Sequence, residues 1–593
     1  MFVQLIALCL LYYGSYYLVN LRKARRMRLP YISVPFVSQN SPFWIIAGPA
    51  SHRWLKQRLP AWLYDRIVMT IYGFEFFTGQ KPYRDWIEPQ IRADPALVGE
   101  GKTYALVTSG NFEINTHDPE VIQQILARPK DFRQNEMASF VVAQFGNNVL
   151  TTDGADWSRH RRIVAGAVTE RVSSVVWNES LRQTQALLDL VTAKSNATTH
   201  ELFDFVKTVT IHVLYAAGMG EQQEFNSVIE TGKPLKPGKT LSYIDAVKIV
   251  NQNIAGPLVL PKTVLLNWPT WLPGYQWFHE LGRAKREFPL YTTELLEEER
   301  ARATASSEVR NNIMSALIAA SDRGDADPEN AKKGPALSRE ELVGNLYVFT
   351  AAGFDSTANT IAYTMVFLVQ NPEWQDWIFE EIDKEIPEDS TLDYTTIYPK
   401  MTRVLAVLFE TLRLFPAILH ITKQVHMPQD ITTSKMTIRV PTKCTVYVNC
   451  IALHRDPATW RDLNRAAKEP DFDRYEGRPD ELRFRPSRWI NPTGSSHTHF
   501  QPPKGAYVPW SGGPRVCPGQ KMAQVEFTGI LVTLLRRHRL EVVRRDGESD
   551  NDVWKRLDDI MTESAPKLTM EMDVFNVKAD EDRGVTFRFI RRR

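Results

Sequence analysis

The sequence contains few cysteines and carries almost no net charge. Four of its 593 residues are cysteine, namely Cys9, Cys444, Cys450 and Cys517, which is too few for a disulfide-rich secreted scaffold. A formal net charge of +3 is too small to indicate a nucleic-acid-binding protein. Hydrophobic residues make up 43% and charged residues 24% of the chain, so pervasive disorder is excluded and a core can form without disulfides.

Acidic residues are absent from the N-terminal end, because Asp65 is the first Asp or Glu of the chain. The run from Met1 to Leu21 carries no charge, and as a helix it would reach about 30 Å, the thickness of a bilayer core. Five bases follow between Arg22 and Arg28, where the positive-inside rule places the cytoplasmic flank. Residues 1–21 are therefore predicted to form a membrane anchor.

A cleaved signal peptide is the main alternative for this segment. Such a peptide needs positive charge before its apolar run and a small-x-small cleavage site after it, whereas here the bases follow the run. We therefore expect an uncleaved anchor over 1–21, a basic, proline-containing connector over 22–60, and one large domain over 61–593. The apolar stretches Pro42–Ala47 and Trp62–Phe77 belong either to the bilayer surface or to the core.

The pattern of apolar residues favours helices over most of the chain. Helical periodicity dominates from His117 to about Leu414, and short alternating runs such as Met436–Val440 and Cys444–Val448 follow. There is no internal repeat. This pattern predicts one mainly α domain with small β-sheets, whose strands gather late in the chain.

The longest predicted helix begins after Ser338, which forms an S-x-x-E capping box with Glu341, and it ends at Gln370 before Asn371-Pro372. Its middle is apolar on nearly every face, so we expect it to cross the interior.

Four residues inside this apolar helix break the local rules, namely Gly353, Asp355, Ser356 and Thr357. Glycine in a helix costs about 1 kcal/mol relative to alanine, and a buried carboxylate is costly unless it is partnered. Such exceptions in a buried helix often mark a functional site.

Nucleotide-binding motifs are missing from the chain. The segment Gly99–Thr103 resembles the end of a phosphate-binding loop, but the first glycine of that motif would fall on Ala96. No G-x-G-x-x-G follows a predicted strand, which argues against a built-in flavin or nicotinamide domain.

Cys517 differs from the other cysteines in its surroundings. Cys444 and Cys450 lie on apolar alternating sequence and are expected to be buried. Cys517 follows a run rich in Gly and Pro and directly precedes a predicted helix, whose N-terminus and backbone N–H groups would stabilise a thiolate. Arg515 can hold an anionic group nearby. These features suit a thiolate ligand to a metal cofactor that carries carboxylates, and haem fits that description.

The segment from Pro509 to Gly519 resembles the cysteine loop of cytochrome P450 monooxygenases, and its amino-acid sequence is similar to that of the fungal membrane-bound members. The family's aromatic position holds Trp510 instead of Phe. Further family motifs match in chain order: Trp157 with Arg161, the helix motif Ala352–Thr357, Glu410 with Arg413, and Phe484–Trp489.

This resemblance implies a cytochrome P450 fold with haem b as cofactor and Cys517 as its axial thiolate. Trp157, Arg161 and Arg515 would bind the haem propionates. His420 is either a further propionate ligand or a core histidine. The other matched residues have two implied roles: proton delivery to dioxygen by Asp355 and Ser356, with Thr357 able to replace Ser356, and a structural triad of Glu410, Arg413 and Arg488.

The resemblance also implies a reaction and its partners. The protein would insert one oxygen atom from O2 into a lipophilic small molecule, in fungal secondary metabolism, with electrons from a separate NADPH-cytochrome P450 reductase. Its anchor would place it in the endoplasmic reticulum membrane with the catalytic domain facing the cytosol. Two alternatives stay open: a haem-thiolate isomerase or dehydratase that needs no reductase, and a non-catalytic membrane haem-binding sensor.

Overall fold

A computed structural model of the chain describes most of its residues. The described residues are 2–34, 55, 57–60, 62–63, 86–98, 101–225, 238–254, 257–305, 310–326, 336–463, 477–491, 499–562, 564–566, 568–572 and 584–592. Two apolar stretches were predicted to belong either to the bilayer surface or to the core. The first, Pro42–Ala47, and most of the second, Trp62–Phe77, lie outside the described residues.

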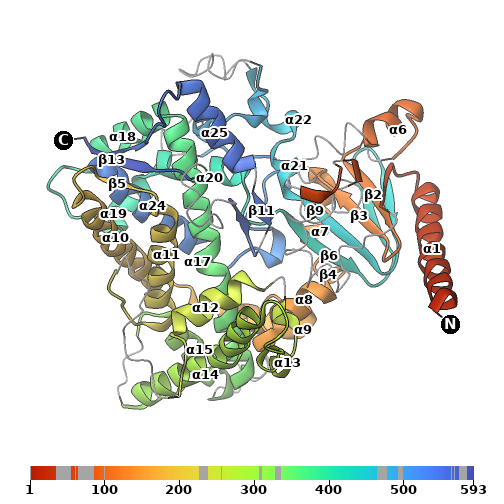
Figure 1. The fold of residues 1–593 in the computed structure, drawn as a ribbon, viewed down its shortest axis with the longest axis horizontal. Helices are drawn as coiled ribbons and strands as arrows, with labels where there is room; N and C mark the ends of the chain where they lie inside the picture. The colour runs from red at the N-terminus through yellow and green to blue at the C-terminus, as the bar shows by residue number, and fades with distance from the viewer. Residues whose placement is uncertain are drawn as a thin grey trace.

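Helices make up most of the described body (Figure 1). The larger ones are α9 (Gly154–Ala167), α10 (Glu170–Thr192), α11 (Leu202–Met219), α12 (Tyr243–Gln252), α14 (Tyr275–Ala305), α15 (Ile313–Ala326), α17 (Arg339–Gln370), α18 (Glu373–Glu385), α20 (Thr402–Leu414), α24 (Gln520–Arg536) and α25 (Asp550–Thr562). The prediction of a mainly α fold with small sheets is confirmed.

Helix α17 runs through the middle of the body (Figure 1) and packs against α11, α20 and α24. The predicted capping box is present, since the Ser338 hydroxyl accepts the Glu341 N–H and the Glu341 carboxylate accepts the Ser338 N–H. The helix ends at Gln370, as predicted, with Asn371 as its C-cap, and most of its 32 residues are buried. Its apolar sequence therefore reflects burial on nearly all sides.

The largest sheet has six strands in the order β1-β2-β3-β9-β6-β4. Its strands are β1 (Tyr31–Val34), β2 (Thr103–Thr108), β3 (Glu113–Thr116), β4 (Phe132–Gln134), β6 (His420–Val425) and β9 (Cys444–Asn449). The expectation that strands gather late in the chain was incomplete, because β3 pairs in parallel with β9 and so joins two distant segments. Strand β9 pairs with β6 on one side, and the backbone N–H and C=O groups on its other side are free to pair with a strand from any part of the chain, here β3.

Three smaller sheets complete the described strands. Strand β13 (Phe587–Arg591) lies between β10 (His538–Val542) and β5 (Thr198–Thr199), while β7 (Gln429–Thr432) pairs with β8 (Thr437–Val440) and β11 (Ala565–Pro566) with β12 (Met570–Glu571).

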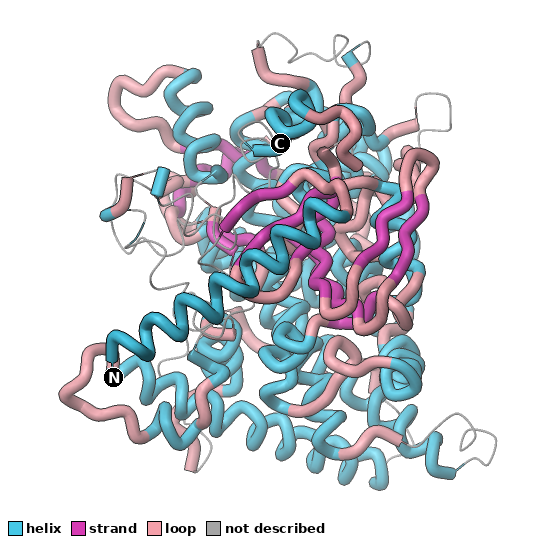
Figure 2. Tube along the Cα trace, turned by 90° about the vertical axis from the view of Figure 1, so that its right-hand side faces the viewer, coloured by secondary structure: helices cyan, strands magenta, loops and turns pink. Residues whose placement is uncertain are grey.

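Helix α1 (Phe2–Arg26) leaves the body at its N-terminal end and lies against the sheet at its C-terminal end (Figure 2). The buried Asn20 side chain donates to the carbonyls of Thr108 (3.0 Å) and Gly110 (2.8 Å), and Tyr17 shares a hydrogen bond with Ser33. Large side chains nearer the N-terminus, from Leu10 to Tyr16, are exposed. The second half of α1 is thus part of the folded body, and the first half projects from it.

Among the described residues, helix α11 is the one that is both long and apolar enough to cross a membrane by the usual hydropathy test, and it is mostly buried. Its burial against α10 and α17 explains its apolar sequence as that of a core helix.

Candidate functional site

The loop that carries Cys517 is held by close backbone contacts. The Cys517 N–H donates to the Trp510 carbonyl at 2.9 Å. Gly513 adopts φ +62° and approaches α7 (Pro119–Ala127) so closely that a Cβ would lie 2.2 Å from the Leu126 carbonyl oxygen. Only glycine fits there. Solvent reaches Cys517, whereas Cys444 and Cys450 are buried as predicted.

The Cys517 thiol lies just before the N-terminus of α24. Surrounding protein atoms raise the pKa of this thiol above its ordinary value, but backbone N–H groups of Gly519 and Gln520 and the charge of Arg161 act to lower it. The expected N–H donors at the helix start are therefore in place. The structure also brings Arg161, on α9, into electrostatic range of Cys517.

Arg515 contacts the residues just before α9 and the first turn of that helix. Its Nη2 donates to the Thr152 carbonyl (2.8 Å) and to Asp153 Oδ1 (2.5 Å), and its guanidinium lies 4.7 Å from the centre of the Trp157 ring. Its Nε and Nη1 are buried and have no hydrogen-bond partner among the described residues. A guanidinium group with two buried N–H donors that make no hydrogen bond is suited to bind an anionic group with two oxygen atoms, such as a carboxylate.

His420 begins strand β6 and packs edge-on against the Tyr447 ring of β9, at 5.2 Å between ring centres. Burial lowers the pKa of His420 to about 4, so its imidazole is neutral at neutral pH. It can donate a hydrogen bond but does not add a cation to the Arg515 region.

One face of α17 is open to solvent although the helix lies inside the body. Ala352 is exposed, and Phe349, Gly353 and Ser356 are half-buried, while most of their neighbours are buried. Positions 349, 352, 353 and 356 follow helical spacing and therefore share one face. The Ser356 hydroxyl, which donates to the Ala352 carbonyl at 2.8 Å, belongs to this face.

Asp355 lies on a flank of that face and is buried. Its Oδ2 accepts the Thr569 hydroxyl at 2.6 Å, and Asn359 donates to the same hydroxyl oxygen at 2.8 Å. Thr569 directly precedes β12, so the carboxylate is tied to the C-terminal part of the chain. This contact supplies the partner that a buried carboxylate requires.

Thr357 lies on the other flank and contacts a residue that the sequence interpretation missed. Its hydroxyl donates to the Gly353 carbonyl at 3.1 Å and is hydrogen-bonded with the Glu526 carboxyl group of α24. Burial raises the pKa of Glu526 well above its ordinary value, and the hydrogen bond with Thr357 acts in the opposite direction. Its signal in the sequence was its position as the sole acid of α24, directly before the apolar residues that begin at Phe527.

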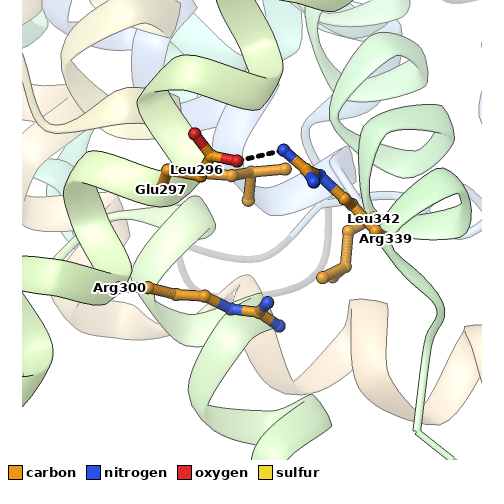
Figure 3. Close-up of a pocket in the computed structure, with 5 residues that line it drawn as sticks. All are labelled: Leu296, Glu297, Arg300, Arg339 and Leu342. Atoms are coloured by element: carbon orange, nitrogen blue, oxygen red, sulfur yellow. Dashed lines mark hydrogen bonds and ion pairs between the residues drawn. The ribbon is translucent and has the colours of Figure 1, made fainter.

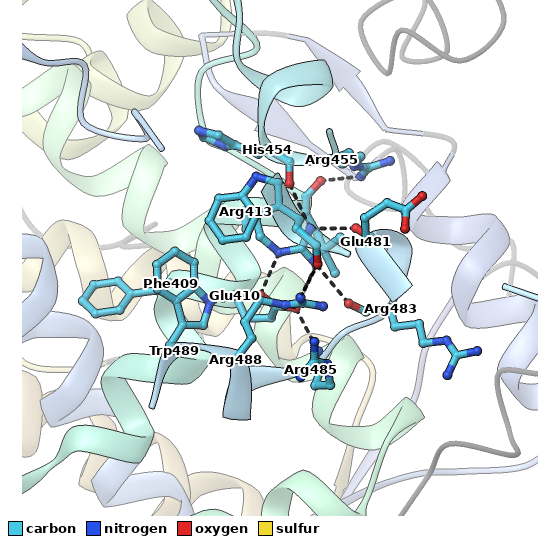
Figure 4. Close-up of polar contacts among 12 residues, drawn as sticks. Phe409, Glu410, Arg413, His454, Arg455, Glu481, Arg483, Arg485, Arg488 and Trp489 are labelled. Atoms are coloured by element: carbon cyan, nitrogen blue, oxygen red, sulfur yellow. Dashed lines mark hydrogen bonds and ion pairs between the residues drawn. The ribbon is translucent and has the colours of Figure 1, made fainter. Parts of the chain in front are cut away.

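Glu410, Arg413 and Arg488 come together in one buried network (Figure 4). Arg413 donates to both Glu410 oxygens at 2.8 Å, and Arg488 Nε donates to Glu410 Oε1 at 2.9 Å. Burial would raise the pKa of Glu410, but the two guanidinium groups bring it down to about 2. The carboxylate is therefore ionised, and its charge is shared between two cations.

Further donors and acceptors complete this network. Trp489 Nε1 and the Arg485 N–H also donate to Glu410, each at 2.9 Å, and Arg413 binds the carbonyls of His454, Glu481 and Arg483 (Figure 4). These contacts join α20 to the segment that contains Arg488. Sequence reasoning did not identify Trp489 or Arg485 as partners.

Arg159 lies on α9, close to the start of α17. It is buried, and it donates to both Glu341 oxygens at 2.9 and 2.6 Å. Hydrogen bonds from Arg159 lower the pKa of Glu341 to about 2. The pair joins α9 to the start of α17.

A separate hollow of about 90 Å³ lies between α14 and the start of α17 (Figure 3). It is lined by Leu296, Glu297, Arg300, Arg339 and Leu342, and an ion pair joins Glu297 to Arg339. None of the predicted site residues lines it, and it is smaller than typical small-molecule sites of about 300–1,000 Å³.

Comparison with known proteins gives the family of this chain. The cytochrome P450 family model matches residues 100–465 and 478–570. The chain belongs to the cytochrome P450 family and is a cytochrome P450 monooxygenase.

Its relatives include fungal enzymes. The chain is 36% identical to the phomenoic acid biosynthesis cluster cytochrome P450 monooxygenase of Leptosphaeria maculans, over 94% of each chain. It is 26% identical to the cytochrome P450 monooxygenase prx9 of Penicillium rubens, over 74% of this chain and 76% of that protein.

Solved structures share the fold at low identity. The haem domain of cytochrome P450DA superposes with a TM-score of 0.63 at 18% identity, covering 95% of this chain and 98% of that one. The retinoic acid-bound cyanobacterial CYP120A1 gives a TM-score of 0.60 at 16% identity, covering 88% and 96%.

The cofactor of this family and fold is haem b with a cysteine thiolate as axial ligand. The residues of this chain fit that group on two observations: an open thiol at Cys517, and the two unpartnered donors of Arg515.

Proposed function

We propose that this protein is a membrane-bound monooxygenase that inserts one oxygen atom from O2 into a lipophilic small molecule. Electrons would come from a separate NADPH-cytochrome P450 reductase. The monooxygenase class rests on the family, and the proposal concerns the residues, the partner, the substrate class and the location.

The observation that carries the residue assignment is the contrast among the cysteines. Cys517 is open to solvent in a loop held by Gly513 and Trp510, while Cys444 and Cys450 are buried. Cys517 is therefore proposed as the axial ligand. Haem held by a thiolate supplies the activation of dioxygen.

Four residues are proposed to hold the haem propionates: Trp157, Arg161, Arg515 and His420. The idle donors of Arg515 and its stacking on Trp157 support the first three as one group. His420 would act as a neutral donor because burial lowers its pKa to about 4. Glu410, Arg413 and Arg488 are proposed to lock the scaffold, and their full set of hydrogen bonds supports this role.

Proton delivery is assigned to Asp355 and Ser356. Ser356 lies on the open face of α17, where a reacting molecule can reach its hydroxyl. Asp355 lies one residue earlier, held by Thr569, and can pass a proton to that hydroxyl directly or through water. Thr357, whose hydroxyl adjoins Glu526, is proposed as the replacement for Ser356.

The substrate class and pathway rest on relatives and on the open face of α17. The name of the Leptosphaeria relative places that enzyme in a biosynthetic gene cluster for phomenoic acid, which supports a role in fungal secondary metabolism here. Phe349 and Ala352 on the open face of α17 would favour a lipophilic substrate.

The location follows from the N-terminal segment. We assign residues 1–21 to a single-pass anchor in the endoplasmic reticulum membrane, 22–60 to a basic connector, and 61–593 to the monooxygenase domain facing the cytosol. The exposed residues from Leu10 to Tyr16 support an anchor in the first half of α1. Strand β1 and the buried Asn20 indicate that the folded body already includes parts of α1 and the connector.

Cys517→Ala tests the ligand assignment. The variant is expected to lose the thiolate-type spectrum of the reduced carbon monoxide complex, whereas Cys444→Ala and Cys450→Ala keep it. A thiolate spectrum that survives in Cys517→Ala would refute the assignment. Product analysis with reductase and candidate lipophilic substrates then tests the reaction, and turnover without reductase would favour the isomerase alternative.

A further inference from the structure

The β11–β12 hairpin lies beside α17 (Figure 1) and is bound to it by polar side chains of that helix. Asp355, Asn359 and Tyr363 are spaced four residues apart, so they share one face of α17. All three are buried. Tyr363 shares a hydrogen bond of 2.5 Å with Ser564, which directly precedes β11. Asp355 and Asn359 both contact the hydroxyl of Thr569, which directly precedes β12.

Two further contacts hold the hairpin in place. Lys207 of α11 donates to Glu571 Oε1 at 3.1 Å, and the Met570 N–H donates to the Ala417 carbonyl at 2.8 Å. Ala417 belongs to the segment between α20 and β6. The hairpin is thus tied to three parts of the body, and Thr569 has a fixed place beside Asp355.

The hydrogen bonds of Thr569 have a defined direction. A hydroxyl group has one hydrogen to donate, whereas an amide nitrogen can only donate. The Asn359 amide nitrogen lies 2.8 Å from Thr569 Oγ1 and 3.4 Å from Asp355 Oδ2. Thr569 therefore accepts from Asn359, and its single hydrogen is left for Asp355 Oδ2, 2.6 Å away. Both donors face one carboxylate oxygen, an arrangement that favours the ionised form of Asp355.

We propose that Thr569 and Asn359 are positioning residues, which hold the Asp355 carboxylate ionised and in one orientation next to Ser356. Asp355 lies on the flank of the open face of α17 that carries Ser356. A carboxylate held in this way can take up a proton and pass it on without first changing its orientation. This inference rests on the proposed role of Asp355 in proton delivery. It gives Thr569, which lies outside every motif of the sequence, a part in the reaction.

Loss of the Thr569 hydroxyl should affect the use of electrons more than the binding of substrate. One hydrogen bond to a charged group corresponds to about a tenfold change, or more, in a conformational equilibrium. Asp355 would then seldom keep its present orientation, so proton delivery would become slow. We expect about tenfold less product per NADPH consumed, more hydrogen peroxide, and a larger solvent deuterium isotope effect.

Full-length holoprotein with Thr569→Val or Thr569→Ala tests this proposal, because both variants remove the hydroxyl, and Thr569→Ser restores it. Ser564→Ala is the matched control, since it removes a buried hydroxyl of the same hairpin that contacts α17 through Tyr363. Asp355→Asn is the reference for lost proton delivery.

The assay uses reductase and NADPH with dodecanoic acid as the lipophilic probe. Three quantities are measured: product and peroxide per NADPH consumed, the solvent isotope effect on NADPH consumption, and the dissociation constant of the probe from the haem spectrum. We expect Thr569→Val and Thr569→Ala to lose coupling about tenfold and to show the larger isotope effect at an unchanged dissociation constant. Thr569→Ser and Ser564→Ala should stay near the values of the unmutated protein.

Denaturant unfolding gives a readout that does not depend on activity. If Thr569 acts through Asp355, the double variant Asp355→Asn with Thr569→Val should lose less stability than the two single losses combined. Fully additive losses would overturn the proposal.

The reference variant separates this inference from the proposed function. Normal coupling and isotope effect in both Thr569→Val and Thr569→Ala, with Asp355→Asn impaired, would overturn the positioning role alone. Normal behaviour of Asp355→Asn would refute the proposed proton delivery itself. Equal losses in Ser564→Ala and Thr569→Val would show that docking of the hairpin, and not the Thr569 hydroxyl, is what matters, which also overturns the proposal.

Discussion

Thr357 on α17 is hydrogen-bonded with Glu526 on α24. The contact joins the helix that carries the proposed proton-delivery residues to the helix that follows the cysteine loop. Glu526 is buried, so the contact lies inside the core between the two helices.

Glu526→Gln should change how stability depends on pH. Burial raises the pKa of Glu526 well above 4.5, so folding keeps a proton that the unfolded chain releases above that pH. The stability linked to this group is full below about pH 4.5 and is lost as pH rises toward the folded-state pKa. Denaturant unfolding at pH 5 and pH 8 should show a smaller loss of stability in Glu526→Gln than in the unmutated protein. Identical losses would mean that Glu526 is ionised in the folded state.

Asp355→Asn should fold and bind haem but form product more slowly, by a factor within the range of about 10²–10⁴ that is typical of general acid–base groups. Ser356→Ala should be milder in rate and should divert reducing equivalents into peroxide. Because Thr357 is proposed to replace Ser356, the double variant Ser356→Ala with Thr357→Ala should exceed either single one.

The measurement for these variants is product formed per NADPH consumed, with peroxide counted in parallel. Thr364→Ala is the control, since it removes a buried hydroxyl two turns further along the same helix. Unchanged rate and coupling in both Asp355→Asn and Ser356→Ala would leave these residues as packing elements of α17.

Glu410→Gln should reduce the free energy of unfolding by about 3–5 kcal/mol, because it removes the carboxylate that Arg413 and Arg488 share. Asp480, whose Oδ1 lies 3.5 Å from Arg488 Nη2, then remains as the carboxylate beside the two buried guanidinium groups. Glu380→Gln, which removes an exposed carboxylate bonded to Arg403, should cost under about 1 kcal/mol. Chemical denaturation of both variants measures the difference. Equal effects would show that the buried network does not stabilise the scaffold.

The pKa of Glu410, lowered to about 2, also predicts a pH dependence for this network. Its contribution to stability is present above the unfolded value near 4.5 and is lost as pH falls toward 2.

Deletion of residues 2–16 should release much of the protein from membranes while haem stays bound. The deleted half of α1 projects from the body, whereas Tyr17 and Asn20 remain to dock on the sheet. Deletion of residues 2–28 should release it as well but lower its stability, since the Asn20 contacts are lost. Full membrane retention of both truncated proteins after a high-salt wash would place the main membrane contact elsewhere.

Asn178 and Asn196 are exposed asparagines of N-x-S/T sequons but should carry no glycan, because the proposed topology keeps them in the cytosol. A mass shift on glycosidase treatment of protein from a eukaryotic host would reverse that topology.

Several features could be predicted because their signals are local. The capping box of Ser338 and Glu341 lies within four residues, and α17 follows it as expected. The cysteine loop carries its own turn residues, and Gly513 is required by one close contact. The mainly α class followed from apolar periodicity, which depends on neighbours along the chain.

Short motifs along the chain were enough to predict the family and to propose most of the candidate residues. Which charged side chains meet could be learned from the tertiary structure alone. Asp153 pairs with Arg515 although 362 positions separate them in the sequence, and Lys423 on β6 lies within electrostatic range of both. Side chains from distant segments share a site only when helices and sheets pack, and periodicity along the chain carries no record of that packing.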